Sequence, residues 1–534
     1  MINIYQLFPR LFGNMTSANK PNGNKNDNGC GLLSDIDNST LQTLAEAGFS
    51  HIWLTGILRH ATLTGYSTIG LKPNHPDITK GLAGSPYSVT DYYDIDPDLA
   101  ADPANRMNQF DDLVKRIHDH GMKVIIDFVP NHLSREYLSQ NTDIEQFGAH
   151  DDTNVFFSPN NNFYYCVGQG FTSPSPKGDT PYTEFPAKAT GNDIFRPDPS
   201  ANDWYDTAKL NYGIDYGDGS RHFDPIPDTW HKMLHIVRYW CSKGVDGFRV
   251  DMAEMVPVEF WKWLITIIKE SFDTVFIAEI YRTELYNSFI CAGFDYLYDK
   301  VGFYNTVESV LVGDTPASAI SQIWKDLDGN DDRMLRFMEN HDEKRLASPH
   351  FLGNADAAKP AMALAALMNK GPLMIYNGQA CGEPAIGAQG YSGDDGRTSI
   401  FDYCAMPELQ KWHNATLDDK QMATLGFYKE LLRLRNSNDA IANGAFYDLM
   451  WCNPWYSNFD PQYVYAFLRY TDKQRVLVAI NFNRHEARHV SVKIPADALE
   501  LMGMRHFSGG MNDFDNEVHD VSINPSGMVI VNLQ

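Results

Sequence analysis

The chain lacks the two kinds of hydrophobic segment that would direct it to a membrane. No apolar run in its 534 residues approaches the roughly 20 residues that a bilayer-spanning helix needs. Its first residues do not combine a basic stretch with an apolar one, as a secretory leader does. We therefore expect a cytoplasmic protein, or a secreted one if the chain was trimmed of an export signal.

Cysteine and basic residues are also scarce. Seven cysteines are scattered without a Cys-x-x-Cys pair, which predicts free thiols in a reducing compartment rather than a disulfide framework or a zinc site. The 44 Lys and Arg residues face 68 Asp and Glu residues, for a formal net charge of −24. Such a surface repels phosphate backbones and anionic lipids, so we expect neither a nucleic-acid nor a membrane partner. A neutral ligand such as a sugar is unaffected.

Hydrophobic residues make up 43% of the chain, enough for a sizeable core. One pattern recurs among them: an amphipathic helix, a glycine and a short apolar strand. The first copy has Ser39 as a candidate N-cap and ends at Gly48, and the next two end at Gly121 and Gly244. Glycine after a helix supplies the left-handed residue that turns the chain back into a strand.

Eight apolar segments are candidate strands of one sheet. They are residues 2–8, 50–55, 123–129, 245–250, 274–278, 294–297, 334–338 and 372–376. Strands that alternate with helices form parallel βαβ units, and eight of them predict an α/β fold of the (β/α)8 TIM-barrel type. The pattern alone also fits a doubly wound sheet.

Two stretches interrupt this alternation. Residues 133–224 are rich in Asn, Pro, Gly, Tyr and Phe without a convincing helix, which predicts an inserted domain after the third strand. From residue 439 the hydrophobic residues alternate as in half-buried strands, which predicts a C-terminal antiparallel β-sandwich over 439–534. The barrel then takes residues 1–132 and 225–438.

Charged and polar side chains follow four of the predicted strands. They are Asp127, Asn131 and His132 after the third, Arg249 and Asp251 on the fourth, Glu279 after the fifth, and His341 and Asp342 after the seventh. In a βα barrel the carboxyl ends of the strands meet at one mouth, so these side chains are expected to converge there. Taken singly, each has an ordinary structural explanation as a helix cap or an ion pair.

Three converging carboxylates suit the cleavage of a glycosidic bond. The oxocarbenium-like transition state needs a negative partner, and the leaving oxygen needs an acid. Arg249 precedes Asp251 by two positions on one strand, so it should keep Asp251 ionised as a nucleophile. Apolar residues come directly before Glu279, which suits an acid that keeps its proton. A second interpretation is a barrel enzyme whose Asp251 and Glu279 bind magnesium.

Several short segments resemble the conserved regions of the α-amylase family, glycoside hydrolase family 13. They are residues 127–132, 247–251, 278–281 and 339–342, supported by 85–93, 209–212 and 371–379. The resemblance spans the whole chain and implies a barrel, an inserted domain B and a C-terminal domain C. It implies Asp251 as nucleophile, Glu279 as general acid/base and Asp342 as transition-state stabiliser. It also implies that substrate is bound by Tyr87, Asp127, His132, Arg249, His341 and Arg345.

The sequence departs from the family pattern in two places. Glu254 and Met255 stand where many amylases have a Lys-His pair, and the segment that begins with Lys209 lacks its usual Asp. Both departures argue against a plain starch-degrading α-amylase. Calcium is allowed by the resemblance at Asn131, although no cofactor is required. A second calcium-like pattern, which begins at Asn24, is better explained as a loop.

The leading hypothesis is a retaining hydrolase of α-glucosidic bonds, mainly α-1,4, in maltodextrins or related oligosaccharides. One alternative is transfer to a sugar acceptor by a glucanotransferase or a disaccharide-converting enzyme on the same scaffold. Another is a sugar-binding or transport-associated member without catalysis. The oligomeric state is left open.

Overall fold

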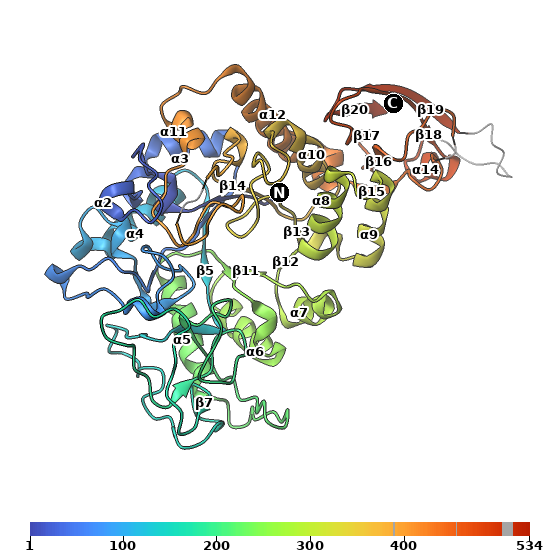
Figure 1. Cartoon of the computed structure of the whole chain (residues 1–534). Coiled ribbons are helices and arrows are strands. Elements are labelled where there is room, and N and C mark those ends of the chain that lie inside the picture. The colour runs from blue at the N-terminus through green and yellow to red at the C-terminus, as the bar shows by residue number, and fades with distance from the viewer. Residues whose placement is uncertain (388–389, 455, 505–515, 534) are drawn as a thin grey trace.

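The computed structural model describes residues 1–387, 390–454, 456–504 and 516–533, and every structural statement below concerns these residues. Figure 1 shows three regions: a central barrel, an inserted lobe around β7 (Tyr165–Cys166) next to it, and a group of C-terminal strands on another side. The termini both lie away from the inserted lobe.

The barrel consists of eight parallel strands, in the segments that the sequence predicts. They are β1 Asn3–Leu7, β2 His51–Leu54, β5 Lys123–Phe128, β10 Gly247–Val250, β11 Val275–Ala278, β12 Tyr296–Tyr298, β13 Met334–Leu335 and β14 Leu373–Tyr376. Their order in the sheet follows the chain, and β1 pairs with β14. The ring closes where Arg336 forms a parallel bridge with Leu373. The closed, sequential order confirms the TIM barrel and excludes the doubly wound alternative.

Helices alternate with the strands and surround the barrel. The barrel helices are α1 Pro9–Phe12, α2 Lys25–Asn28, α3 Asn38–Ala47, α4 Arg106–Asp119, α5 Asp228–Ser242, α6 Val258–Lys269, α7 Tyr286–Ala292, α8 Asn305–Val312, α9 Ser321–Leu327, α10 Lys359–Leu367, α11 Pro407–His413 and α12 Asp419–Ser437. The three glycines predicted to end helices all have a positive φ, of 103° at Gly48, 73° at Gly121 and 87° at Gly244.

The N-cap of α3 lies two residues earlier than the sequence predicts. Asp37, rather than Ser39, is the cap of α3, and its carboxylate accepts a hydrogen bond of 2.8 Å from the backbone N–H of Thr40. Both side chains are good caps. Asp37 takes the position because the helix already includes Asn38, which places Ser39 in its first turn.

The inserted lobe is built from short antiparallel strands and loops, without an α-helix between residues 133 and 224. β6 (His132–Ser134) leaves the barrel and pairs with β9 (Thr207–Lys209), and β7 pairs with β8 (Ala187–Lys188). Aromatic rings fill the lobe: Phe163, Tyr164, Tyr165 and Phe171 are each less than 8% exposed. Because β6 follows β5 after only three residues, the lobe is attached at the mouth of the barrel.

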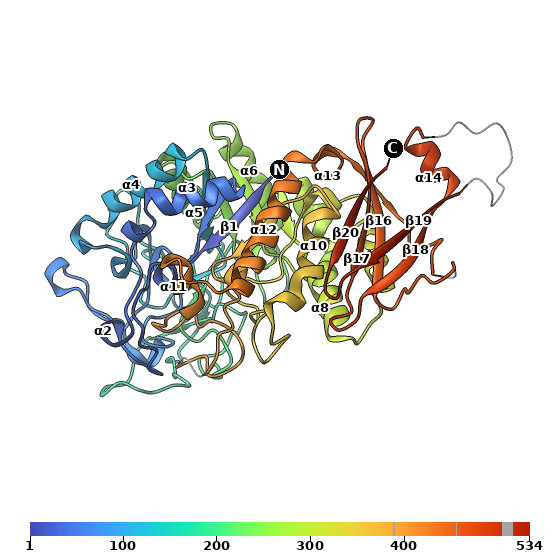
Figure 2. The same ribbon diagram turned by 90° about the horizontal axis from the view of Figure 1, so that it is seen from above.

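The C-terminal region forms two antiparallel sheets. The larger contains β15 Ala445–Asp448, β16 Val464–Tyr470, β17 Arg475–Asn481 and β20 Met528–Leu533, and the smaller contains β18 Arg488–Ile494 and β19 Glu517–Ile523. Two short helices accompany them, α13 Asp439–Asn443 and α14 Ala496–Leu501. Figure 2 shows these sheets beside α8 and α10, and Arg469 of β16 donates a 3.0 Å hydrogen bond to the Leu367 carbonyl at the end of α10.

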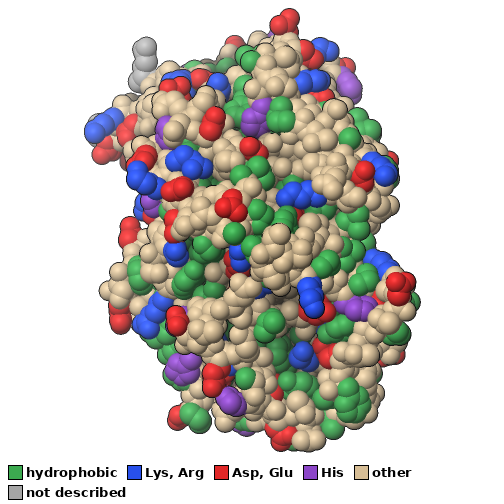
Figure 3. All heavy atoms as spheres, turned by 90° about the vertical axis from the view of Figure 1, so that its left-hand side faces the viewer, with side chains coloured by type: hydrophobic (Ala, Val, Ile, Leu, Met, Phe, Trp, Pro, Cys, Tyr) green, Lys and Arg blue, Asp and Glu red, His purple; other side chains and the backbone are tan. Residues whose placement is uncertain are grey.

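The surface carries charges of both signs. Acidic and basic side chains are interspersed over the face drawn in Figure 3 and do not form one basic patch there. Among the described residues, no helix is long and apolar enough to cross a membrane.

The cap of α3 can be tested with two neighbouring substitutions. Asp37→Ala is expected to lower the free energy of unfolding by about 1 kcal/mol, the usual contribution of an N-cap. Ser39→Ala, the matched control, should change it by less than about 0.5 kcal/mol. Urea unfolding measures both, and an equal loss in the two variants would contradict the assignment of Asp37. The hydrogen bond from Thr40 lowers the pKa of Asp37, so the difference should disappear as the pH falls through that lowered pKa.

Candidate active site

A cavity of about 270 Å³ lies where the carboxyl ends of β10 and β11 meet the inserted lobe. Fourteen residues line it: Lys80, Ser85, Tyr87, His132, Trp204, Asp206, Thr207, Asp251, Met252, Glu279, Tyr281, Asp342, Ile400 and Phe401. They come from the barrel, from the lobe and from the segment after β14. All three predicted catalytic carboxylates are among them.

Arg249 joins the carboxylates beneath this cavity. One terminal nitrogen of its guanidinium lies 2.9 Å from Asp251 Oδ1, and the other lies 2.8 Å from Glu279 Oε2. Asp127 Oδ1 is 3.4 Å from the first nitrogen, because Asp127 and Arg249 are paired residues of neighbouring strands. The guanidinium is 1% exposed, so these ion pairs are sheltered from water.

Burial affects the pKa of Asp251 more strongly than the neighbouring Arg249 does. Burial and the nearby Glu279 carboxylate raise the pKa of Asp251, and Arg249 opposes this without reversing it. The sequence predicts that Arg249 keeps Asp251 ionised; in the structure, burial and the Glu279 carboxylate outweigh the arginine, so Arg249 does not bring the pKa of Asp251 down to its usual value.

Glu279 is also in a more polar environment than the sequence suggests. Its Oε1 accepts a 2.8 Å hydrogen bond from the Tyr281 hydroxyl, and its Oε2 accepts one of 2.8 Å from the backbone N–H of Met252. The apolar residues that precede Glu279 belong to β11 and pack into the barrel. The donors, together with Arg249, fix the orientation of the carboxylate.

The pKa of Asp342 is lowered, unlike that of Asp251, because the positive groups near Asp342 outweigh the effect of burial. Burial by itself would raise the pKa of Asp342, but the adjacent His341, with Arg249 and Arg397, lowers it to about 2. His341 Nε2 lies 3.1 Å from Asp342 Oδ2 and 2.5 Å from the Tyr87 hydroxyl. The Gln6 side chain contacts the other ring nitrogen at 2.9 Å. Asp342 is therefore ionised at neutral pH.

His132 and two aromatic rings form the wall toward the lobe. Burial, followed by the charge of Lys209, lowers the pKa of His132 to about 3, so its imidazole is neutral at pH 7. The Trp204 ring lies 5.1 Å from it, centroid to centroid. Tyr87 stacks on His341 at 5.2 Å.

The predicted site residues fall into three groups. Tyr87, His132, Asp251, Glu279 and Asp342 line the cavity, while Asp127, Arg249 and His341 lie behind them and hold them in place. Arg345 does not point into the cavity. Its guanidinium is buried against Glu339 at 2.9 Å and donates to the Asn377 carbonyl, so the structure does not support its assignment to substrate binding.

Several lining residues were not singled out from the sequence. Lys80 and Asp206 form a 3.0 Å ion pair between the barrel and the lobe, and Trp204 precedes Asp206 by two positions. Only Tyr281 could have been found, because it closes a segment that resembles a conserved region. The buried lobe rings Phe163, Tyr164, Tyr165 and Phe171 do not line the cavity and pack within the lobe instead.

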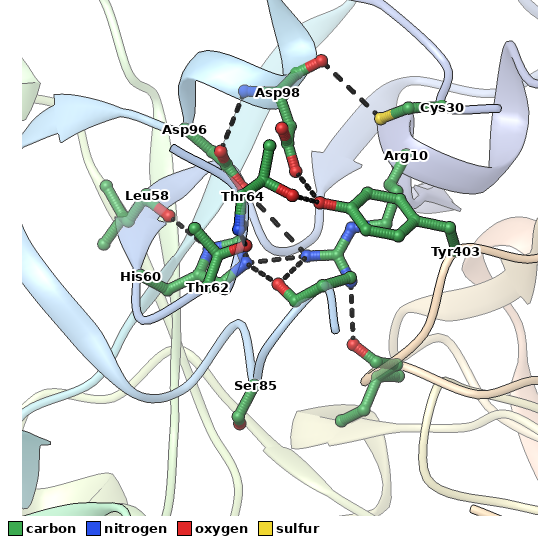
Figure 4. A network of polar contacts seen from close by, with 12 residues as sticks. Arg10, Cys30, Leu58, His60, Thr62, Thr64, Ser85, Asp96, Asp98 and Tyr403 are labelled. Atoms are coloured by element: carbon green, nitrogen blue, oxygen red, sulfur yellow. Dashed lines mark hydrogen bonds and ion pairs between the residues drawn. The ribbon is translucent and has the colours of Figure 1, made fainter. Parts of the chain in front are cut away.

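A buried polar cluster supports the rim of the cavity (Figure 4). It consists of Arg10, His60, Asp96, Asp98 and Tyr403, which point toward one another. Arg10 also donates to the carbonyls of Ile400 at 3.0 Å and Ala83 at 3.3 Å. Ile400 lines the cavity, and Ala83 comes two residues before Ser85 of the opposite rim. The cluster thus links two rim segments that are far apart in the sequence.

The site is not arranged as a metal centre. Arg249 occupies the position between the carboxylates that a magnesium ion would need, which argues against a metal-dependent barrel enzyme. Among the described residues, no group of three or more His, Cys, Asp and Glu side chains could hold a metal. The calcium-like pattern at Asn24 is a helix cap, since its side chain accepts from the backbone N–H groups of Asn26 and Asp27.

Arg249 should be a strong determinant of stability as well as geometry. Arg249→Met leaves several buried carboxylates without their cation and is expected to lower the free energy of unfolding by about 3–5 kcal/mol at pH 7. Without the arginine, the folded-state pKa values of Asp127 and Asp251, which burial already raises, rise further above the unfolded values. The penalty is therefore largest at high pH and should shrink as the pH falls toward 4. Urea unfolding at pH 7 and pH 5 measures this, with Arg433→Met as control, because the Arg433 side chain is 61% exposed and pairs with Glu430 on its own helix. A loss that does not depend on pH would contradict the explanation.

Comparison with known proteins agrees with this geometry. Residues 6–271 match the family model "Alpha amylase, catalytic domain". Alpha-amylase 2 of Dictyoglomus thermophilum is 25% identical over 79% of this chain and 62% of its own length. Cyclomaltodextrinase of Thermoanaerobacter pseudethanolicus is 22% identical over 90% of this chain and 70% of its own.

A solved structure extends the similarity to the whole fold. The maltogenic alpha-amylase AmyB from Thermotoga neapolitana superimposes with a TM-score of 0.60 at 20% identity, over 99% of this chain and 96% of that one. The catalytic-domain match, the sequential barrel and the carboxylates at its mouth lead to one conclusion: the chain belongs to the α-amylase family.

Proposed function

We propose that this protein is a retaining glycoside hydrolase that cleaves α-glucosidic bonds, mainly α-1,4, in maltodextrins or related oligosaccharides. One observation carries the proposal: two cavity-lining carboxylates, Asp251 and Glu279, bind the two terminal nitrogens of a single buried guanidinium. The named activities of the relatives, a cyclomaltodextrinase and a maltogenic alpha-amylase among them, support this substrate class.

Retention is the mechanism general to the family, and the shared guanidinium is compatible with it. Retaining glycosidases keep their carboxyl groups about 5–5.5 Å apart, whereas inverting enzymes leave about 6.5–9.5 Å for a water molecule. Both N···O contacts of Arg249 are shorter than 3 Å, and its terminal nitrogens belong to one rigid planar group. The two carboxylates therefore face the same rigid group, an arrangement that suits a nucleophile and an acid acting on one glycosidic bond.

In the first step, Asp251 attacks the anomeric carbon while Glu279 donates its proton to the leaving glycosidic oxygen. A covalent glycosyl-Asp251 ester forms and the C–O bond to the leaving sugar breaks. In the second step, Glu279 takes a proton from water, whose oxygen attacks the same carbon and releases Asp251. The first step requires a proton on Glu279 and an ionised Asp251, and Arg249 can stabilise the negative charge of Asp251 through their 2.9 Å contact.

The remaining wall residues suit the transition state. Asp342 is negative at neutral pH and can offset the positive charge that develops on the sugar ring. His132 is neutral, and because the Asn131 amide nitrogen faces its Nδ1, only its other ring nitrogen is left for a sugar hydroxyl. Tyr87 offers a ring face beside these groups, held by His341.

The experiment that tests the proposal is a time course of the products of maltopentaose, with the anomeric form read by NMR before mutarotation. Shorter sugars that appear first as α-anomers would support retaining hydrolysis. Products released first as β-anomers would contradict the proposed retaining mechanism. Longer sugars that accumulate beside shorter ones would favour the transferase alternative.

Asp251→Asn should lower kcat by about 10⁴-fold, as loss of a nucleophile does, while the fold is kept. The control is Asp273→Asn, because Asp273 precedes β11 at the other end of the strand and its side chain is 98% exposed. Circular dichroism establishes folding for both variants. An active Asp251→Asn enzyme would exclude Asp251 as the nucleophile.

The non-catalytic alternative is disfavoured by the same carboxylates, since all three line the cavity. We also propose a cytoplasmic location. All seven cysteines lie among the described residues and are free thiols, which suits a reducing compartment.

A further inference from the structure

Lys209 lies at the end of β9 with a side chain that is 2% exposed, and its ammonium group reaches the junction of the lobe and the barrel. The nitrogen contacts three oxygens. Asp193 Oδ1 is 2.7 Å away, the Met255 carbonyl is 3.3 Å away, and Asn131 Oδ1 accepts a short hydrogen bond. An ammonium group has three N–H donors, so each of them has a partner.

These three oxygens come from three separate segments. Asn131 follows β5 in the barrel, Asp193 belongs to the lobe, and Met255 follows β10 at the mouth of the barrel. Lys209 itself is in the strand that pairs with β6, opposite His132. One cation therefore connects the lobe to the barrel on two sides.

We infer that the Lys209 ammonium takes the place that calcium would have at Asn131, so that this chain fastens its lobe without a divalent ion. Calcium needs about six to eight oxygen ligands at roughly 2.3–2.6 Å, whereas this site offers three oxygens from the protein. Only one of these comes from a carboxylate, whose single negative charge is balanced by the lysine. A divalent cation next to a buried ammonium would be repelled, and the same oxygens cannot serve both.

The two sequence departures noted above belong to this one arrangement. Lys209 stands where an Asp is usual, and Met255 contributes its backbone carbonyl where a histidine is usual. The exchange of an acidic residue for a basic one converts the position from a ligand into the cation itself.

Lys209 is also a positioning residue for the cavity wall. The Asn131 amide that accepts from Lys209 donates to the Gly191 carbonyl at 2.8 Å and lies 3.1 Å from His132 Nδ1. Loss of the ammonium would free this amide and, through it, the imidazole that lines the cavity. The inference does not rest on the proposed function, because stability can be measured without substrate.

Thermal unfolding with 5 mM calcium chloride and with excess EDTA tests the inference on the full chain. The wild-type melting temperature should be the same in both. Lys209→Met should lower it by at least about 3 °C, and Lys188→Met, a partly exposed lobe lysine paired with Glu184, should change it by less than about 1 °C. Lys209→Asp places a second carboxylate beside Asp193, and calcium should then raise its melting temperature.

Two results would overturn the inference. The first is a wild-type melting temperature that falls in EDTA, returns with calcium and loses this response in Asp193→Asn, because the metal would then be bound by these ligands. The second is a Lys209→Met protein as stable as the Lys188→Met control. Measurement of kcat distinguishes the positioning of His132 from the attachment of the lobe. Lys209→Arg should keep a larger share of the wild-type kcat than Lys209→Met, since arginine restores the positive charge near Asn131.

Discussion

The arrangement of the site depends on one buried guanidinium. Arg249 contacts Asp127, Asp251 and Glu279, and it is flanked by the rings of Trp53, Tyr87 and Tyr298 at 5.4–5.5 Å. The aromatic faces favour a cation there and keep water out. Without this charge, the mouth of the barrel would bring together acids that repel one another. The same ion pairs stabilise the site and orient its reactive carboxylates.

The barrel and its carboxylates could be predicted because they follow from local patterns. Strands such as 123–129 and 245–250 are short apolar runs after a glycine-ended helix, and parallel topology brings whatever follows them to one mouth. Asp251 and Glu279 were found in this way. Arg345 was assigned with the family resemblance, as a residue that follows Asp342 by three positions, and closeness in the sequence does not fix the direction of a side chain. Its guanidinium turns to Glu339 instead.

The lobe could not be predicted beyond its existence, because it has no periodic pattern. The closeness of Lys80 to Asp206 and the ring of Trp204 beside His132 depend on how a loop-rich segment folds back over the barrel. Ionisation could not be predicted either. The pKa of Asp251 is raised by burial despite its arginine, and burial is a property of the assembled fold.

A lysine at the junction affects how the lobe attaches to the barrel during folding and how it stays attached afterwards. A fastening ion taken from solution must be captured during folding, can be diluted away, and ties the enzyme to the composition of its surroundings. A cation that is covalently part of the chain arrives with synthesis and is present in one copy per molecule at any dilution. On this inference, the junction between the lobe and the barrel is independent of the calcium concentration, and so is the geometry of the cavity that the lobe covers.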